Sequence, residues 1–510
     1  MKKNSSGVWD ERDLKSYSDV LNIAGDIYCD NVFISEYGGR EITYGEFNLT
    51  VNRCCNYFYS NKINTGDVIT VVLKNSIDFL VIYFASLRCE VIVNPLPHQT
   101  AIDEIITISE KVKPKIIFTG DFHHNQLLKY NEELNVTNID NYKNGFIEYL
   151  HSYDCGFDNS KKPQNPIAAY YVSSGTTGEQ KVICYSHKSM VRSQISMFRS
   201  GFSKEGDTHL CFLPLGHTAA LRYTVKQIIL SGSKVVLCES FWKIRTKLWD
   251  IVEQYKITFF QTVPSILVMI LNTKYSIKKA QLKSIRFVGC GSAFLSKELQ
   301  NNFQEKYGLY LSNMYGLSET GATHYDNPFV TGRFTGNIGK PFDIYDIAII
   351  NNGKQCLPNT IGEIAIKGDG LFSGYLKEND NELYWDGYFL TGDIGKVDCS
   401  GIYHYVERKK DLIVRGGINI LPSSIDSILL ENKDVVESAT VGVYDPVYGE
   451  RVISYIVCKE QVDTESMLNE CKMKVGAFKA PSEIILVDKL PKGPSGKILK
   501  RVLREKVKQI

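Results

Sequence analysis

The feature that most constrains the fold of this chain is a repeated alternation between short apolar runs and longer amphipathic segments. Runs rich in β-branched and apolar side chains, as expected of buried strands, occupy residues 68–73, 167–172, 234–237 and 285–288. Helical spacing of apolar residues is found between such runs, at residues 76–88 and 296–307. Strands that alternate with helices form a parallel sheet covered by helices, so the sequence predicts an α/β fold.

The pattern changes twice toward the C-terminus. From about residue 339, strand-like runs follow one another without a long helical pattern between them, at residues 344–350, 361–367 and 401–406. After residue 410 mixed patterns return, with a helix predicted at 423–431 and strands at 438–443 and 452–458. We therefore expect a large N-terminal domain, residues 1–409, of two α/β subdomains plus a β-rich subdomain at about 339–407. Residues 410–510 are expected to form a small α+β C-terminal domain.

Composition argues against several classes of partner. The chain has 59 basic and 57 acidic residues and a net charge of +2, so the sequence predicts no nucleic-acid binding. The longest apolar runs, at 79–87 and 265–271, are too short to span a membrane. The N-terminal residues form no apolar signal core, and the thirteen cysteines contain no Cys-x-x-Cys pair. We expect a cytoplasmic protein whose cysteines are mostly buried and reduced.

A phosphate-binding loop is predicted at residues 173–181, directly after the strand-like run at 167–172. The loop reads Ser-Ser-Gly-Thr-Thr-Gly-Glu-Gln-Lys. Its glycines let backbone amides approach an anion, its hydroxyls donate hydrogen bonds, and Lys181 adds positive charge. It is not a Walker loop, because Val182 stands where that motif has Ser or Thr after the lysine. Taken alone, the segment is equally compatible with an ordinary turn between strands.

Further segments with candidate chemistry lie toward the C-terminus. Residues 313–319 read Asn-Met-Tyr-Gly-Leu-Ser-Glu and offer an aromatic ring for a base, a hydroxyl for phosphate and a carboxylate for magnesium. Asp393 follows a glycine and could accept hydrogen bonds from ribose hydroxyls. The remaining segments are the charged run 407–411, the glycine pair 416–417 and the Gly- and Lys-containing run 491–498. Each alone has an ordinary explanation, as a helix cap, a turn, a surface ion pair or a solvated lysine.

Together and in this order, the segments resemble the adenylate-forming superfamily, which includes acyl- and aryl-CoA ligases, firefly-type luciferases and the adenylation domains of peptide synthetases. The resemblance covers nearly the whole chain, since further matching segments occupy residues 41–47, 214–217, 290–296 and 478–481. It implies an enzyme that uses ATP and Mg²⁺ to convert a carboxylic acid to an acyl-adenylate with release of pyrophosphate. The acyl group then passes to the thiol of CoA. Residues 1–409 would be the AMP-binding domain, and the small C-terminal domain would be mobile.

The resemblance also assigns roles to individual residues. The ATP phosphates would be bound by Ser173, Ser174, Gly175, Thr176, Thr177, Gly178 and Lys181. Adenine and ribose would be bound by Gly291, Ser292, Ala293, Met314, Tyr315, Gly316, Asp393 and Arg408. The catalytic set would comprise Ser318 on phosphate, Glu319 on Mg²⁺, His217 at the acid site and Lys497, which would bridge the carboxylate and the α-phosphate. Lys410 would be the hinge of the small domain, and Gly416 and Gly417 would face the thiol.

The chain departs from the family pattern at four places. Gln180, Lys181 and Val182 stand where the phosphate loop usually ends in Pro-Lys-Gly. Ser318 replaces the more frequent Thr, and Glu407 replaces the Gly that usually precedes the arginine. Residues 89–90 read Cys-Glu in place of the common Ala-Gly after the predicted helix 76–88. None of these changes removes a catalytic group.

The acid pocket is expected to be formed by His217, Leu221, Val288, Gly289, Leu317 and Thr323. His217 resembles the histidine at the mouth of the acyl site, although a packed histidine in a cleft explains it equally well. Amino-acid-activating relatives have an Asp near residues 214–220, where this chain has none, and a buried ammonium without a carboxylate is costly. The sequence therefore predicts a fatty or aryl acid.

Two other functions remain compatible with the sequence. In the first, the acyl group passes to the phosphopantetheine of an acyl carrier protein, because the thiol arm is the same as that of CoA. In the second, the chain is a nucleotide-binding sensor or scaffold without catalysis. The presence of Lys497, Glu319 and Asp393 argues against the second alternative.

Overall fold

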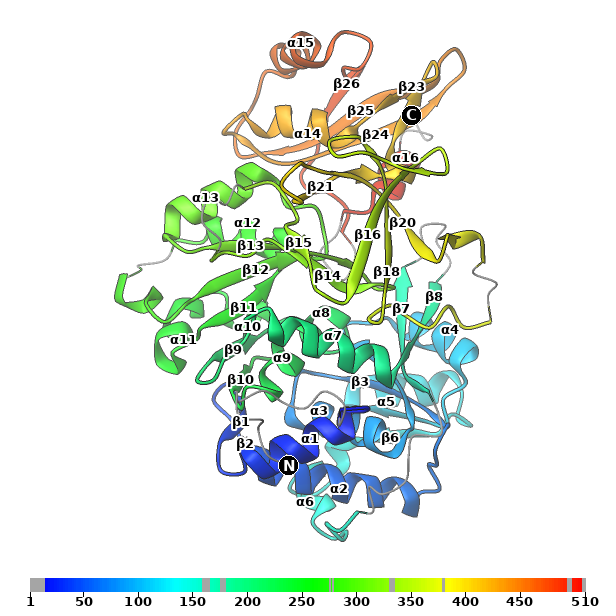
Figure 1. Ribbon diagram of the computed structural model, residues 1–510, viewed down its shortest axis with the longest axis vertical. Coiled ribbons are helices and arrows are strands. Elements are labelled where there is room, and N and C mark those ends of the chain that lie inside the picture. The colour runs from blue at the N-terminus through cyan, green and yellow to red at the C-terminus, as the bar shows by residue number, and fades with distance from the viewer. Residues whose placement is uncertain are drawn as a thin grey trace.

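The computed structural model of the protein describes residues 14–157, 166–174, 180–274, 277, 279–329, 335–377, 381–492 and 498–506. Strands in these residues form four sheets, and Figure 1 shows the smaller C-terminal unit above the large N-terminal part. The predicted α/β fold with a small α+β C-terminal domain is confirmed. The domain boundary near residue 410 stays a prediction.

The first α/β subdomain is built on a six-stranded sheet. Its strands lie in the order β6 (Val136–Asn138), β5 (Ile116–Thr119), β3 (Val68–Leu73), β4 (Ile92–Pro97), β7 (Ile167–Ser174) and β8 (Gln180–Ser186). Neighbouring strands are parallel except β7 and β8, which form an antiparallel pair. Parallel strands of this kind need helical crossovers, which here include α3 (Ile77–Cys89), α4 (Ile102–Val112) and α5 (Asp121–Tyr130).

The second α/β subdomain is built on a nine-stranded sheet. Its strands lie in the order β15 (Lys340–Pro341), β14 (Gly321–Tyr325), β13 (Leu311–Leu317), β12 (Phe287–Gly291), β11 (Phe259–Thr262), β9 (Thr208–Cys211), β10 (Lys234–Leu237), β1 (Val32–Glu36) and β2 (Glu41–Thr43). The central strands from β13 to β1 are parallel, and the strands at both edges are antiparallel. Its helices include α7 (His187–Arg199), α11 (Leu248–Tyr255), α12 (Pro264–Asn272) and α13 (Lys297–Tyr307).

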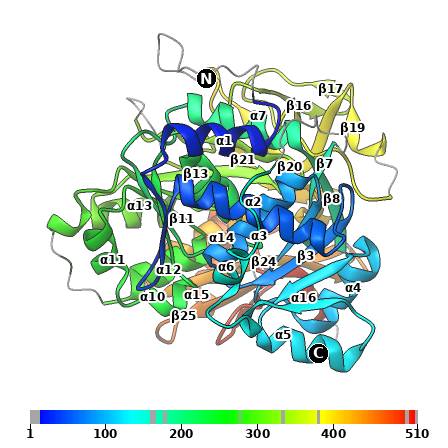
Figure 2. The same cartoon turned by 90° about the horizontal axis from the view of Figure 1, so that it is seen from below.

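Helix α3 is buried along its whole length, which explains why most of its residues are apolar. It contacts β3, β4 and β7 on one side, and α1 (Tyr17–Ile27) and α2 (Tyr44–Ser60) on the other, as Figures 1 and 2 show. The helix begins at an N-cap, where the Ser76 side chain accepts a hydrogen bond from the Phe79 N–H. It ends at Glu90, which has the left-handed conformation with φ 56°. Glycine is favoured at such a C-cap, so the Gly that the family usually has here would adopt this conformation without strain.

The third sheet is antiparallel and has little helix around it, as predicted. Its strands lie in the order β17 (Lys354–Gln355), β16 (Tyr345–Asn351), β18 (Gly362–Gly368), β20 (Tyr388–Val397) and β19 (Tyr384–Trp385), and β21 (Tyr403–Arg408) also pairs with β20. The fourth sheet lies beyond residue 410 and comprises β23 (Ile418–Ile420), β22 (Ile413–Arg415), β25 (Gly449–Cys458), β24 (Val435–Asp445) and β26 (Glu483–Leu486). The helices there are α14 (Pro422–Leu430), α15 (Thr464–Val475) and α16 (Lys500–Lys506).

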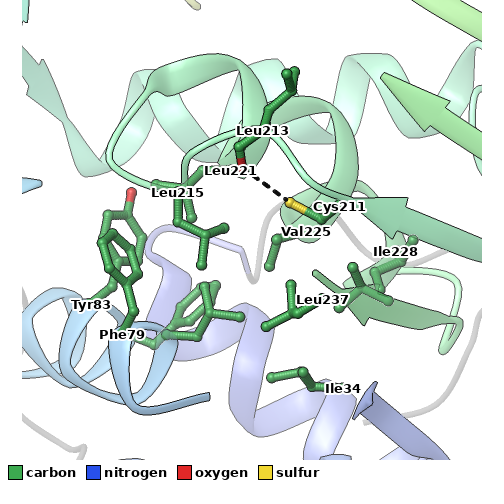
Figure 3. Packing of buried hydrophobic residues seen from close by; sticks show 14 of the residues in the cluster. Ile34, Phe79, Tyr83, Cys211, Leu213, Leu215, Leu221, Val225, Ile228 and Leu237 are labelled. Atoms are coloured by element: carbon green, nitrogen blue, oxygen red, sulfur yellow. Dashed lines mark hydrogen bonds between the residues drawn. The ribbon is translucent and has the colours of Figure 1, made fainter. Parts of the chain in front are cut away.

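A short helical segment after β9 joins the core to the region of the predicted site. It consists of α8 (Thr218–Ala220), a π-helical turn at Leu221–Val225 and α9 (Lys226–Ile229). Figure 3 shows Leu221, Val225 and Ile228 of this segment among the apolar side chains of the largest core cluster. Cys211 at the end of β9 donates a hydrogen bond from Sγ to the Leu213 carbonyl, at 3.7 Å. One face of the segment is therefore fixed by the core.

Two expectations from composition can be compared with the structure. Most of the thirteen cysteines are buried and none forms a disulfide. Among the helices of the described ranges, none combines the length and the apolar character needed to cross a membrane.

Gly339 joins the second and third sheets, and its replacement should destabilise the fold. Gly339 has φ +80°, and a Cβ there would lie 1.9 Å from the Tyr325 carbonyl oxygen. Its own carbonyl accepts a hydrogen bond from the Tyr403 N–H of β21. Gly339→Ala should lower the free energy of unfolding by about 1–3 kcal/mol because of this overlap. Denaturant unfolding measures the effect, and Gly156→Ala is the control because Gly156 is exposed. Equal stability of the two variants would contradict the prediction.

Candidate active site

Three chain segments that are far apart in the sequence meet at the loop between β13 and β14, which carries Ser318 and Glu319. The Tyr185 hydroxyl of β8 donates a hydrogen bond to the Ser318 carbonyl at 2.7 Å. From the other side, the Phe372 N–H donates to the Glu319 carbonyl at 2.9 Å. The segment that follows Phe372 also pairs with β8, since the Ser373 N–H donates to the Cys184 carbonyl at 2.7 Å. The structure thus brings the predicted Ser318 and Glu319 next to the strand that carries Lys181.

Tyr375 links two residues that the sequence predicts to act on ATP. Its hydroxyl donates a hydrogen bond to Glu319 Oε1 at 2.9 Å. The Lys181 ammonium lies over its ring, with Nζ 4.5 Å from the ring centroid. One side chain therefore orients the carboxylate predicted for Mg²⁺ and the cation predicted for phosphate.

The departure from the family pattern around Lys181 has a structural explanation. Gln180 Nε2 donates to Glu104 Oε1 of α4, and the Lys111 ammonium of α4 donates to the Gln180 carbonyl at 2.7 Å. Val182 is buried in the apolar cluster below the sheet. These contacts attach the start of β8 to α4 and fix the backbone on either side of Lys181.

Only part of the predicted phosphate loop can be located. The backbones of Ser173 and Ser174 end β7 and lie opposite Lys181 and Gln180 of β8. Four of the predicted residues lie outside the described residues, namely Gly175, Thr176, Thr177 and Gly178. The β7–β8 pairing nevertheless places the loop at the end of a buried strand, where ligands gather in α/β folds.

The two predicted ribose residues form a buried ion pair with each other, and the predicted adenine residue Tyr315 is hydrogen-bonded to it. Arg408 Nε lies 2.9 Å from Asp393 Oδ1, and Asp393 is 2% exposed. The Tyr315 hydroxyl of β13 donates to Asp393 Oδ2 at 2.8 Å. Arg408 Nη1 also donates to the Thr391 carbonyl at 3.1 Å. Burial and the nearby Asp393 raise the pKa of Tyr315 well above its ordinary value, so its hydroxyl keeps its proton and remains a donor.

The other predicted adenine residues lie at the ends of the adjacent strands β12 and β13. Gly291 ends β12 opposite Met314 of β13, and a Cβ on Gly291 would lie 2.5 Å from the Met314 carbonyl oxygen. Gly316 is even more tightly enclosed, because a Cβ there would lie 1.7 Å from the Gly321 carbonyl oxygen. After β12 the chain turns outward, so that Ser292 is exposed and Ala293 is partly exposed. The glycines at these positions are needed for close backbone packing.

The expected acid-pocket residues surround the same strands, with different degrees of exposure. Leu221 and Val288 are buried in the largest core cluster, and Leu317 packs against that cluster. Gly289 lies against Gln261, whose Oε1 would be 2.0 Å from a Cβ. The Thr323 hydroxyl is already engaged with His324 Nδ1 at 2.9 Å. An inner wall formed by these residues would be tightly packed.

His217 is a partly exposed member of this group and precedes the helical segment after β9. Its Nδ1 accepts a hydrogen bond from the Ala219 N–H at 3.4 Å, so it caps α8. Burial and the neighbouring Arg222 lower the pKa of His217, so the ring is neutral at physiological pH. The cap supports the structural interpretation of this histidine, and a contact with the acid stays a prediction.

The predicted hinge residue Lys410 is exposed in a short turn between β21 and β22. Ion pairs hold both of its neighbours, since Lys409 Nζ lies 2.8 Å from Glu363 and Asp411 lies 2.8 Å from Arg504. Lys497 lies outside the described residues, as do the four residues before it. Its predicted role therefore remains as it was inferred from the motif.

Sequence patterns did not single out Tyr375, Tyr185 or Arg222. Tyr375 and Tyr185 resemble ordinary aromatic residues of strands, and their contacts depend on chain segments that lie far away in the sequence. For Arg222 and Lys226 the sequence contains one indication of an unusual site, since these two cations, four residues apart, interrupt a mainly apolar run. Such a pair indicates either solvated side chains or a buried cationic site.

The residues around Glu319 fit a magnesium ion that is shared with a nucleotide. No cluster of three or more potential metal ligands occurs among the residues that the structure describes. Mg²⁺ usually binds to one or two carboxylates together with the phosphates of a substrate, so a single carboxylate is sufficient. The hydrogen bond from Tyr375 occupies Oε1 of Glu319 and orients the group. The oxygen donor of Glu319 matches this mode of binding.

Comparisons with known proteins find matches over most of the chain. The profile of the AMP-binding enzyme family matches residues 24–376, and that of the AMP-binding enzyme C-terminal domain matches residues 424–497. A sulfoacetate–CoA ligase of Cupriavidus necator is 27% identical over 91% of this chain and 92% of its own length. An oxalate–CoA ligase of Arabidopsis thaliana is 26% identical over 97% of this chain and 99% of its own length. The crystal structure of ATP-bound MatB from Rhodopseudomonas palustris superimposes with a TM-score of 0.89, at 25% identity, over 96% of this chain and 99% of that chain.

The link between Tyr375 and Glu319 generates a testable prediction. Tyr375→Phe removes the hydroxyl but keeps the ring under Lys181. Without this hydrogen bond, binding must order the Glu319 side chain at a cost of about 0.5–1.5 kcal/mol, so the affinity for MgATP should fall by roughly two- to tenfold. Calorimetric titration with MgATP measures the change. Tyr388→Phe is the matched control, since the Tyr388 hydroxyl also donates to a carboxylate, that of Asp346, at an exposed position. Equal affinities in both variants would remove the positioning role of Tyr375.

Proposed function

Because the chain belongs to the AMP-binding enzyme family, we propose that it activates a carboxylic acid with ATP and transfers the acyl group to CoA. In the first step the acid carboxylate attacks the α-phosphate of ATP, forming an acyl-adenylate as pyrophosphate leaves. In the second step the CoA thiol attacks the acyl carbon and AMP leaves. The observation that carries the proposal is that β13 and the loop after it contact both the strand of Lys181 and the Asp393–Arg408 pair.

In the first step, different residues would bind different parts of the nucleotide. Lys181 and the loop before it would hold the β- and γ-phosphates, and Ser318 would donate to phosphate. Asp393 would accept hydrogen bonds from ribose, while Arg408 places a positive charge beside that buried carboxylate. Tyr315 closes the same region, with its ring near that of Tyr405. Mg²⁺, when bound near Glu319, would offset the negative charge that pyrophosphate carries away.

A second lysine is needed because the reaction joins two anions. A carboxylate and a phosphate at about 4 Å repel each other by about 4 kcal/mol at an effective dielectric constant near 20. Lys497 would offset this repulsion by contacting both groups at once. It belongs to the C-terminal domain, so the second step would begin when that domain turns about Lys410 and removes the lysine. Gly416 and Gly417 would then border the path of the thiol.

The identity of the acyl acceptor and that of the activated acid are inferred from different observations. Relatives named as CoA ligases favour CoA over the phosphopantetheine of a carrier protein. The names of two of them, for sulfoacetate and oxalate, refer to acids that carry two anionic groups. The fatty or aryl acid inferred from the missing Asp and the cytoplasmic location both stay predictions.

Lys497→Ala tests whether this lysine acts in adenylation but not in thioester formation. Acid-dependent exchange of pyrophosphate into ATP should fall by about 100-fold or more, because the repulsion between the two anions is no longer offset. Conversion of a supplied acyl-adenylate to the thioester should remain close to that of the unmodified protein. Isotope exchange and thioester formation measure the two steps, and Lys489→Ala, an exposed lysine nearby in the sequence, is the control. Equal loss of both steps would contradict the assignment.

Lys410→Pro tests the hinge. Proline fixes φ and removes the N–H, so it should restrict rotation of the backbone at this position. We expect thioester formation to decrease by about tenfold while adenylation changes less, since only the second step needs the rotated domain. Lys410→Ala removes the charge without restricting the backbone and serves as the control. The same two assays apply, and a larger loss of adenylation than of thioester formation would argue against a hinge at this residue.

A further inference from the structure

Arg222 and Lys226 form a cationic site that the proposed reaction does not use. Thr218, Arg222 and Lys226 line one small cavity, on a different face of the helical segment from Leu221, Val225 and Ile228, which pack into the core. The segment contains a π-helical turn, and such turns are frequent at functional sites. Thr218 directly follows His217, so the cavity borders the residue predicted at the mouth of the acid site.

The cavity contains positive charge but no carboxylate. Its lining residues are Tyr17, Tyr171, Tyr185, Ser189, Met190, Ser193, Gln194, Thr218, Arg222, Lys226 and Gln227. Neither Arg222 nor Lys226 takes part in the ion pairs formed between described residues. An uncompensated buried cation is costly, and it is retained more easily where a ligand provides the opposite charge.

Tyrosine rings offset only part of the free-energy cost of burying these two cations. Lys226 is 6% exposed, and its Nζ lies 4.7 Å from the ring centroid of Tyr17 and 5.1 Å from that of Tyr83. Arg222 lies over the ring of Tyr185 at 5.5 Å. Burial and Arg222 hold the pKa of Lys226 well below its ordinary value, so a proton is easily lost from this site. A bound anion would offset both causes and favour the charged lysine.

The cavity is connected to the reaction site through two contacts. Tyr185, over which Arg222 lies, donates to the Ser318 carbonyl. Gly321 follows the Ser318–Thr320 loop, and a Cβ on Gly321 would lie 3.0 Å from Arg222 Cζ. The positive charge therefore lies directly behind the loop that carries Glu319. Tyr17 also lines the cavity, and its hydroxyl donates to the Met190 carbonyl at 3.4 Å.

We propose that Arg222 and Lys226 bind a second anionic group, a carboxylate or a sulfonate, on a short acid that the enzyme activates. This inference rests on the proposed ligase function. The planar guanidinium of Arg222 suits a bidentate contact with such a group. The cavity volume of about 20 Å³ leaves no room for a long alkyl chain. The proposal differs from the fatty or aryl acid predicted from the sequence, because that prediction considers only the missing Asp.

Matched pairs of acids test this proposal with the full-length protein. Acid-dependent pyrophosphate release is measured for propanoate and malonate, butanoate and succinate, and acetate and sulfoacetate. We expect a higher kcat/KM for the dianionic member of at least one pair. Arg222→Met should lower that value by roughly 30-fold or more and change the value for the monocarboxylate little. Arg222→Lys should restore part of the difference, and Arg199→Met, at an exposed arginine of α7 paired with Asp343, should leave it unchanged.

A second measurement separates failure of this site from failure of the ligase function. Malonate or succinate should raise the unfolding temperature of the unmodified protein but not that of Arg222→Met or Lys226→Met, with folding of each variant checked by circular dichroism. If no acid supports pyrophosphate release, the ligase function fails and this shift alone decides the anion site. A preference for monocarboxylates, an equal loss for both members of a pair, or an equal shift with chloride or phosphate would overturn the proposal.

Discussion

The buried ion pair between Asp393 and Arg408 is the interaction on which the arrangement of the site depends. Asp393 belongs to β20 and Arg408 to β21, while Tyr315, which donates to the same carboxylate, belongs to β13 of another sheet. The three side chains thus fix the β-rich sheet against the nine-stranded sheet. Removing one partner of such a pair would leave an uncompensated charge, which costs about 3–5 kcal/mol. The same contact positions the residues predicted to bind the nucleotide and the end of β21, which precedes the predicted domain boundary.

The sequence was sufficient to predict the elements whose identity depends on local pattern. The runs at 68–73 and 234–237 are strands with these bounds, and the change to β structure after residue 339 is present. The run at 285–288 was less accurate, because the strand is Phe287–Gly291. It continues through Gly289 and Gly291, where close packing of Gln261 and Met314 leaves no space for a Cβ. Glycines inside a strand give little strand signal in a sequence.

Much of the site could not be predicted, because it consists of contacts between distant segments. Tyr375 and Glu319 are 56 residues apart, and Tyr185 and Ser318 are 133 apart. No local pattern indicates which tyrosine will meet which loop. The cavity of Arg222 was hidden for another reason. A cation within a helical run usually extends to solvent, whereas Lys226 is buried and lines this cavity together with Arg222.

Glu407 stands where the family usually has a glycine, and its contacts would affect rotation of the C-terminal domain about Lys410. Its Oε2 accepts a hydrogen bond from the Ser423 N–H at the start of α14, and the Ser423 hydroxyl donates to the Val406 carbonyl. Both bonds cross Lys410, whereas the ion pairs of Lys409 and Asp411 each remain on one side of it. A turn of the domain about Lys410 would therefore break the two crossing bonds and leave both ion pairs intact. Each broken bond costs about 0.5–1.5 kcal/mol, so a glycine at 407 would shift the resting equilibrium toward the rotated domain.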